Sequence, residues 1–208
     1  MSAESKNEDK HQCANLYHAI IRDHVDCVDS AINLCMSMIF NMQDAIKTMT
    51  FRMANKLIEK GFNFTYYVSG YPNQITPLIY VENEKIIDLI IEKGNVDFSY
   101  KLYRNSTVFE CILECFSLEA IKKIIKKHPK LLNSKEYKSD LLISTCDEDF
   151  EKFKYLIEEC DCDPYYENNF NQSAYDYIID EAGEFYDEEL QKCLKYLQSR
   201  KSKETNDT

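Results

Sequence analysis

Residues 76–97 read TPLIYVENEKIIDLIIEKGNVD, and this stretch decides the fold of the chain. Thr76 can cap a helix, and Pro77 suits the first helical position, where a missing N–H costs nothing. After an acidic turn, apolar residues recur at helical spacing until Gly94, which offers the left-handed conformation that ends a helix. The stretch therefore predicts two short antiparallel helices whose apolar faces are covered by neighbouring copies of the same unit.

Copies of this unit recur along the chain. The expected helix ends are Gly61, Gly94, His128 and Cys160, at spacings of 33, 34 and 32 residues. The expected starts of the first helix in successive units are Thr76, Thr107, Ser139 and Ser173, at spacings of 31, 32 and 34 residues. A period near 33 residues indicates a repeat protein in which each unit contacts only its neighbours.

This period, with a Thr- or Ser-capped helix followed by a second helix, resembles the ankyrin repeat. The resemblance is carried by the sequences of residues 76–94, 163–177 and 16–28. It implies an all-α, ankyrin-type solenoid of about six helix-turn-helix repeats joined by hairpin loops. It also implies a non-catalytic protein–protein interaction module that binds through its hairpin tips and its first-helix side, with another protein as the partner.

The expected organisation is one uninterrupted array between two polar ends. Residues 1–12 are a charged leader and residues 199–208 a polar tail, both expected to be disordered because they have little to bury. The array covers 13–198, with units at about 13–42, 43–75, 76–106, 107–138, 139–172 and 173–198.

Composition restricts the function. A net charge of −11 argues against nucleic-acid binding, which depends on neutralising phosphates. No apolar run of about 18 residues and no signal peptide is found, so we expect no membrane insertion. Nine cysteines, an odd number, suit reduced thiols in the cytoplasm better than a disulfide framework.

The Lys-, Asn-, Ile- and Tyr-rich composition indicates an AT-rich genome. We therefore also consider a host-directed effector acting in the host cytoplasm, and expect a monomer in either case.

Charge is unevenly distributed along the chain. Lysines crowd residues 122–138, whereas residues 147–189 are strongly acidic. Three readings remain open: solvated helix faces, a partner with a basic surface docking on the acidic C-terminal half, or a phosphate or lipid head-group contact at the lysines.

Catalytic and metal-binding motifs are weak. Four scattered glycines exclude phosphate-cradling loops, and neither a Gly-x-Ser-x-Gly elbow nor a His-Glu-x-x-His helix occurs. Cys160 and Cys162 are two residues apart, but the second pair of cysteines or histidines that zinc sites usually require does not accompany them at zinc-site spacing. We expect no cofactor and no metal. The alternative function is a thiol-dependent enzyme or modifier using Cys160, Cys162 and His128. The ankyrin resemblance implies only a local structural role for the turn histidine His24.

Tyrosine is the enriched residue type with functional meaning, because its rigid amphipathic side chain suits interface anchoring. Seven tyrosines lie in the expected hairpins between one helix end and the next helix start. These candidate partner-binding residues are Tyr66, Tyr67, Tyr100, Tyr103, Tyr137, Tyr165 and Tyr166. The acidic stretch that contains Asp147, Glu148 and Glu151 is the competing candidate surface.

Overall fold

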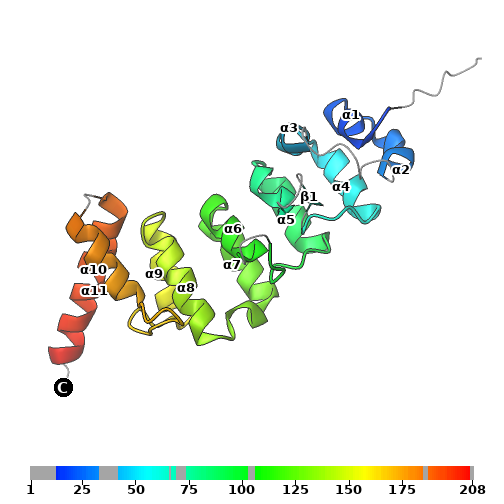
Figure 1. Cartoon of the computed structure of the whole chain (residues 1–208). Coiled ribbons are helices and arrows are strands. Elements are labelled where there is room, and N and C mark those ends of the chain that lie inside the picture. Colours follow the sequence, from blue (N-terminus) through cyan, green and yellow to red (C-terminus); the bar gives the residue numbers. More distant parts are fainter. Residues whose placement is uncertain are drawn as a thin grey trace, which may run out of the picture. The chain divides into compact units, whose positions relative to one another are not determined.

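The computed structural model describes residues 13–32, 42–65, 67–68, 74–102, 106–184 and 187–206. The described chain is mostly helical, in agreement with the expected all-α class (Figure 1). Its contacts divide it into two compact units, Met1–Asn105 and Ser106–Thr208. The division falls within one residue of the expected boundary between the third and fourth repeats. The expected leader, residues 1–12, lies outside the described residues.

The first unit is made of short helices and one small β-hairpin. Its elements are α1 (Leu16–Ile21), η1 (Val25–Cys27), α2 (Val28–Ala31), α3 (Met42–Lys47), α4 (Phe51–Glu59), β1 (Tyr67–Val68), β2 (Gln74–Ile75), η3 (Pro77–Tyr80) and α5 (Glu84–Lys93). β1 and β2 pair antiparallel, with Tyr67 opposite Ile75.

Alternate elements of the first unit are neighbours in space. α1 contacts α3, and α3 contacts η3, while η1 contacts α4, and α4 contacts α5. Large apolar side chains fill the core between these elements, including the fully buried Leu16, Met53, Leu57, Ile86 and Ile90. The contacts therefore run through two series of elements, α1–α3–η3 and η1–α4–α5.

The second unit is made mostly of longer helices, with one 3-10 turn among its described residues. Its elements are α6 (Val108–Cys115), α7 (Leu118–Lys127), η5 (Pro129–Leu132), α8 (Lys135–Thr145), α9 (Phe150–Glu158), α10 (Ala174–Glu184) and α11 (Glu188–Asn206). α8 contacts both α6 and α10, and α9 contacts α11. Phe109, Ile112, Leu142, Phe153 and Leu156 are fully buried.

The expected helix starts are confirmed at Thr107 and wrong at Ser139. Thr107 caps α6 in a full capping box, because its side chain accepts from the Glu110 N–H while the Glu110 side chain accepts from the Thr107 N–H. α8 begins earlier than expected because Ser134 caps it by accepting from the Tyr137 N–H. Ser139 therefore lies within the helix, with 1% of its surface exposed.

The central stretch also differs from expectation. Pro77–Tyr80 is a single 3-10 turn rather than an α-helix, since only six residues separate the caps Thr76 and Asn83. Gly61 adopts the expected left-handed conformation, with φ of 72°. Gly94 does not, because its backbone is extended, with φ of −68° and ψ of 145°. Glycine is needed there for another reason: a Cβ atom would lie 2.5 Å from the Ile90 carbonyl oxygen.

The C-terminal helices are longer than the sequence indicated. α10 extends from Ala174 through Gly183 to Glu184. α11 continues to Asn206 and so includes most of residues 199–208, the expected tail. The side chains of Ser199 and Ser202 donate hydrogen bonds to carbonyl groups three and four residues earlier, within this helix. No helix in the described parts of the chain is both long enough and apolar enough to cross a bilayer.

Candidate functional site

The seven candidate tyrosines differ in their location and burial in the structure. Tyr66 and Tyr103 lie outside the described residues, and only the backbone of Tyr67 is described, in β1. Tyr137 lies in the first turn of α8, so its assignment to a hairpin is wrong. Tyr100 lies in a turn of the first unit, where it is half-buried and its N–H donates to the Asp97 carbonyl group over 3.2 Å.

Tyr137 has a packing role. Its hydroxyl lies 2.6 Å from the Thr107 Oγ1 atom, which ties α8 to the capping box of α6. Burial, followed by the nearby Glu110 carboxylate, raises the pKa of Tyr137 despite the Thr107 hydrogen bond. A half-buried hydroxyl already paired within the unit is a poor anchor for a partner.

Tyr165 and Tyr166 lie on the loop between α9 and α10, and their side chains are engaged to different degrees. The Tyr166 hydroxyl donates to the Glu136 carboxylate over 3.1 Å, and the Lys135 Nζ atom lies 5.9 Å from the centre of the ring. The side chain of Tyr165 is 43% exposed, and its ring lies 5.1 Å from that of Tyr175. Tyr165 is therefore the more accessible of the two.

The loop that carries them, residues 163–173, is organised around one buried side chain. Asn168 is 8% exposed, and its Oδ1 atom accepts from the N–H groups of Phe170 and Gln172 at 2.9 and 3.2 Å. Its Nδ2 atom donates to the Asp140 Oδ1 atom of α8 over 2.8 Å. Asn171 takes the left-handed conformation, with φ of 54°, which asparagine tolerates better than most residues. One amide thus closes the loop on itself and fastens it to a helix.

Two more hydrogen bonds hold the base of this loop. The buried Ser139 hydroxyl donates to the Tyr166 carbonyl group over 2.8 Å, which explains why a serine lies inside α8. The Tyr175 N–H donates to the Pro164 carbonyl group over 3.0 Å, at the start of α10. The loop is therefore fastened to α8 and to α10.

This loop presents Phe170 to solvent. Its side chain is 83% exposed, the highest exposure among the large apolar residues described as exposed. Phe170 is not among the residues predicted from the sequence, because the candidate surface was defined by tyrosines alone. The signal that could have revealed it is the run of turn-forming residues around an aromatic side chain, NNFNQ at 168–172.

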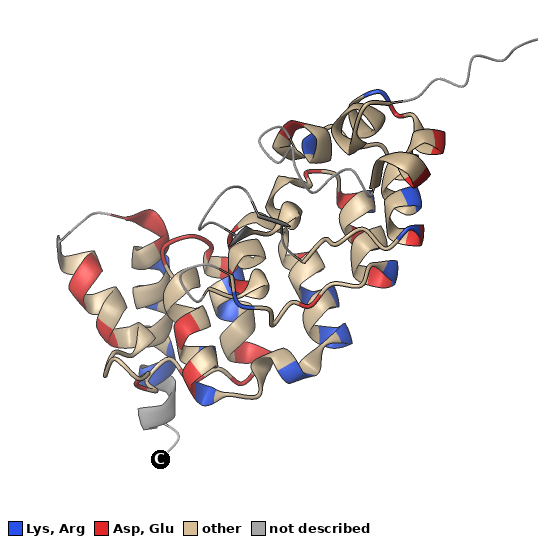
Figure 2. Cartoon of the chain, turned by 45° about the vertical axis from the view of Figure 1, so that its right-hand side comes forward, with Lys and Arg blue, Asp and Glu red and all other residues tan. Residues whose placement is uncertain are grey.

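The sequence that contains this loop, residues 147–189, is strongly acidic, although Lys138 of α8 also reaches the loop and donates to the Asp161 carbonyl group over 3.0 Å. Residues 147–189 contain 16 acidic side chains and two lysines, and the second unit as a whole has 23 acidic and 14 basic side chains, a net charge of −9. Figure 2 shows how acidic and basic residues are distributed along the described part of the ribbon. Partial burial, followed by the Glu148 and Asp147 carboxylates, raises the pKa of Glu114. Lys152 opposes this rise, and its Nζ atom lies 3.2 Å from the Asp149 carboxylate.

The lysine-rich surface of the second unit is a poor candidate for binding phosphate. Lys122, Lys126 and Lys154 line a shallow groove between α7 and α9 together with three glutamates, so the charges of that groove balance. The Lys122 Nζ atom is 2.7 Å from the Glu119 carboxylate and 5.6 Å from the centre of the Tyr155 ring. A phosphate group would meet carboxylates as well as lysines there.

The thiols proposed for the enzyme alternative are poorly suited to nucleophilic chemistry. Cys162 is buried, and burial raises its pKa to about 12. Burial also raises the pKa of Cys160, although a Tyr155 hydrogen bond and the Lys138 charge act in the opposite direction. His128 ends α7, where its N–H donates to the Ile124 carbonyl group. A reactive cysteine needs a lowered pKa, which neither thiol has.

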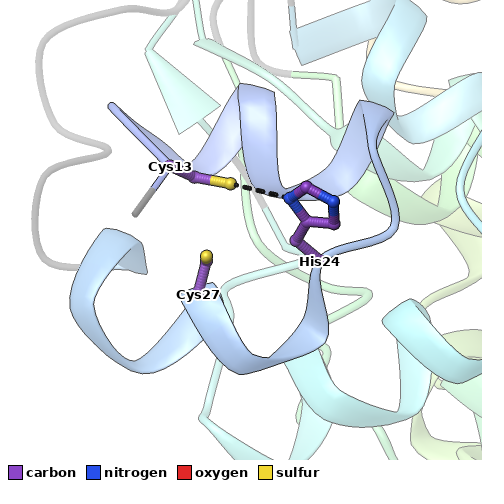
Figure 3. A group of neighbouring side chains, drawn as sticks. All are labelled: Cys13, His24 and Cys27. Carbon is purple, nitrogen blue, oxygen red and sulfur yellow. Dashed lines mark hydrogen bonds between the residues drawn. The ribbon is translucent and has the colours of Figure 1, made fainter. Parts of the chain in front are cut away.

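A different cysteine and histidine group lies in the first unit. Cys13, His24 and Cys27 place one sulfur or ring nitrogen atom each within 4.8 Å of one another, and their side chains converge (Figure 3). The Cys13 Sγ atom lies 3.4 Å from the His24 Nδ1 atom. From the sequence, only a local role was expected for His24, and its contact with Cys13, 11 residues earlier, was not predicted.

Comparison with protein-family models, with curated proteins and with solved structures found no match to this chain.

Proposed function

We propose that this chain is a non-catalytic protein–protein interaction module built from stacked helix pairs of the ankyrin type, and that it binds a partner with a basic surface. The neighbour pattern supports stacked pairs within each unit, because α8 lies between α6 and α10 while α9 contacts α11. Such stacking is typical of helical repeat proteins, whose loops form binding surfaces.

The observation that carries the proposal is Phe170, 83% exposed on a loop held in place by Asn168. A partner that covers this side chain removes its apolar surface from water. This burial stabilises the complex by roughly 25 cal/mol for each Å² of apolar surface. Because the loop is already fastened by hydrogen bonds, little conformational entropy is lost on binding. Aromatic anchors on pre-ordered segments commonly dominate interface energies.

Charge specifies the class of partner. Asp161, Asp163 and Glu167 lie in or next to the same loop, and the region from residue 147 to residue 189 carries the excess of carboxylates described above. Such a surface attracts lysine- and arginine-rich proteins and repels acidic ones, and salt weakens both effects.

A site-specific photo-cross-linker tests the proposal. Placed at position 170 of the full chain and activated in a cell extract, it should capture peptides rich in lysine and arginine, less efficiently as salt is raised. The control places the same group at Phe51, which is 49% exposed in the first unit. Equal capture at both positions, or captured peptides without an excess of basic residues, would contradict the proposal.

For a partner identified in this way, Phe170→Ala should weaken binding roughly tenfold, which corresponds to an anchor of about 1.4 kcal/mol. Phe51→Ala should leave the affinity within about twofold. Both variants should keep their helicity, because neither side chain is buried.

A further inference from the structure

The first unit brings together three side chains that are separated in the sequence. Cys13 precedes α1, His24 lies in the turn between α1 and η1, and Cys27 is the last residue of η1 (Figure 3). Cys13 and Cys27 are 3% and 5% exposed, whereas His24 is partly open to solvent. Among the described residues this is the one group of three that could hold a metal ion.

The spacing of the group agrees with tetrahedral coordination. With zinc–sulfur bonds near 2.3 Å and zinc–nitrogen bonds near 2.0–2.1 Å, ligand atoms at the tetrahedral angle are separated by about 3.5–3.8 Å. The observed 3.4 Å between the Cys13 Sγ and His24 Nδ1 atoms is close to this value, and the other separations are within 4.8 Å. Small side-chain adjustments would bring all three atoms to one ion.

We propose that Cys13, His24 and Cys27 bind one zinc ion. Two sulfur atoms and one imidazole nitrogen form a ligand set that zinc favours and that magnesium and calcium, which prefer oxygen, do not. The described residues provide three ligands, so water or an added ligand takes the fourth position. The His-x₂-Cys segment at residues 24–27 is the sequence signal for this site, since short spacings of this kind recur in zinc sites.

The proposed ion would stabilise the start of the first unit. α1 has six residues and α2 has four, lengths at which helices in water are marginal without other contacts. A zinc ion bound by residues 13, 24 and 27 closes a short loop around α1 and fixes the turn that follows it. Binding to the folded chain alone would then raise its thermal stability.

Metal content and cobalt spectroscopy test the site in the full-length reduced protein. We expect about one zinc ion per chain after dialysis against zinc and removal of the excess. Substituted Co²⁺ should give the sulfur-to-cobalt charge-transfer and visible bands of a tetrahedral thiolate site. Cys13→Ser/Cys27→Ser should lose both signals, while the matched Cys111→Ser/Cys115→Ser, which removes two thiols of the second unit, should keep them.

Because Cys13 and Cys27 are buried, Cys13→Ser/Cys27→Ser could lose zinc by misfolding, and a second variant that changes a more exposed ligand separates the two causes. His24→Gln removes one ligand from a partly exposed position and should weaken zinc binding by about tenfold or more while helicity is kept. A chelator should lower the melting temperature of the wild type and of Cys111→Ser/Cys115→Ser, but not that of Cys13→Ser/Cys27→Ser.

Several results would overturn the proposal. One is equal zinc content in the wild type and Cys13→Ser/Cys27→Ser. Another is a reduced wild-type protein that takes up neither Zn²⁺ nor Co²⁺. A third is a Cys13–Cys27 disulfide that persists in the isolated protein under the reducing conditions used for metal loading. Each of these outcomes leaves the interaction surface of the second unit untouched, so the two proposals are tested separately.

Discussion

Replacing Asn168 by alanine tests whether one side chain orders the loop that presents Phe170. The substitution removes an acceptor for the N–H groups of Phe170 and Gln172 and a donor to the Asp140 carboxylate. Alanine keeps the backbone conformation accessible, so the main change is the loss of these three hydrogen bonds.

The expected cost follows from the three contacts. A typical intramolecular hydrogen bond contributes about 1 kcal/mol net, and bonds to charged groups contribute somewhat more. The Phe170 N–H lies in an exposed part of the loop and can be solvated by water, which reduces its share. We therefore expect Asn168→Ala to lower the free energy of unfolding of the second unit by about 2–3 kcal/mol.

Urea unfolding followed by far-ultraviolet circular dichroism measures this change, because the chain contains no tryptophan to report by fluorescence. The matched control is Asn169→Ala: Asn169 is exposed in the same loop, and its replacement should change the stability by about 0.5 kcal/mol or less. Asn168→Asp should be destabilised at neutral pH, where it faces Asp140, and should recover as the pH falls. Equal stability of Asn168→Ala and Asn169→Ala would refute the assigned role.

Three further outcomes are expected. Gly94→Ala should lower the free energy of unfolding by more than about 1 kcal/mol, because the new Cβ atom meets a carbonyl oxygen. Gly183→Ala, with open space in α10, should raise the free energy of unfolding by about 0.5–1 kcal/mol, and thermal melts of the two variants measure both changes. Glu114→Gln should raise the free energy of unfolding only slightly at pH 7, by less than about 0.5 kcal/mol because solvent screens this exposed side chain. The sign follows from the raised pKa of the folded state, which means that ionisation disfavours the fold; a melting series should show the gain vanish below about pH 4, where the carboxyl group is protonated in both states. Iodoacetamide should alkylate Cys160 and Cys162 more slowly at pH 7 than a free thiol; faster alkylation would revive the enzyme alternative.

The sequence by itself determined the features that depend on neighbouring residues. The Thr107 cap and its partner Glu110 are three residues apart, and a capping box needs nothing beyond one helical turn. The apolar spacing from Ile86 to Ile91 likewise predicted α5 and its buried face. Helix existence and the all-α class were therefore predictable from short-range chemistry.

Helix ends were less predictable because several polar residues can cap. Ser134 and Ser139 are both acceptable starts for α8 by sequence, and the longer helix forms with Ser139 buried and bonded to the Tyr166 carbonyl group, 27 residues away. The role of Gly94 was also misassigned, since its requirement comes from a close approach to Ile90 and not from a left-handed backbone.

The candidate sites depended on tertiary structure almost entirely. The burial of each tyrosine depends on how the loops pack. The Tyr137 hydroxyl contacts Thr107 inside the second unit, whereas the side chain of Tyr165 is 43% exposed. Phe170 is exposed because Asn168 fastens its loop to α8, and Cys13 meets His24 because α1 and its turn fold the chain back on itself. Local propensity acts within a few residues, whereas these contacts join residues 11 to 30 apart, and only the packed chain sets the distance between them.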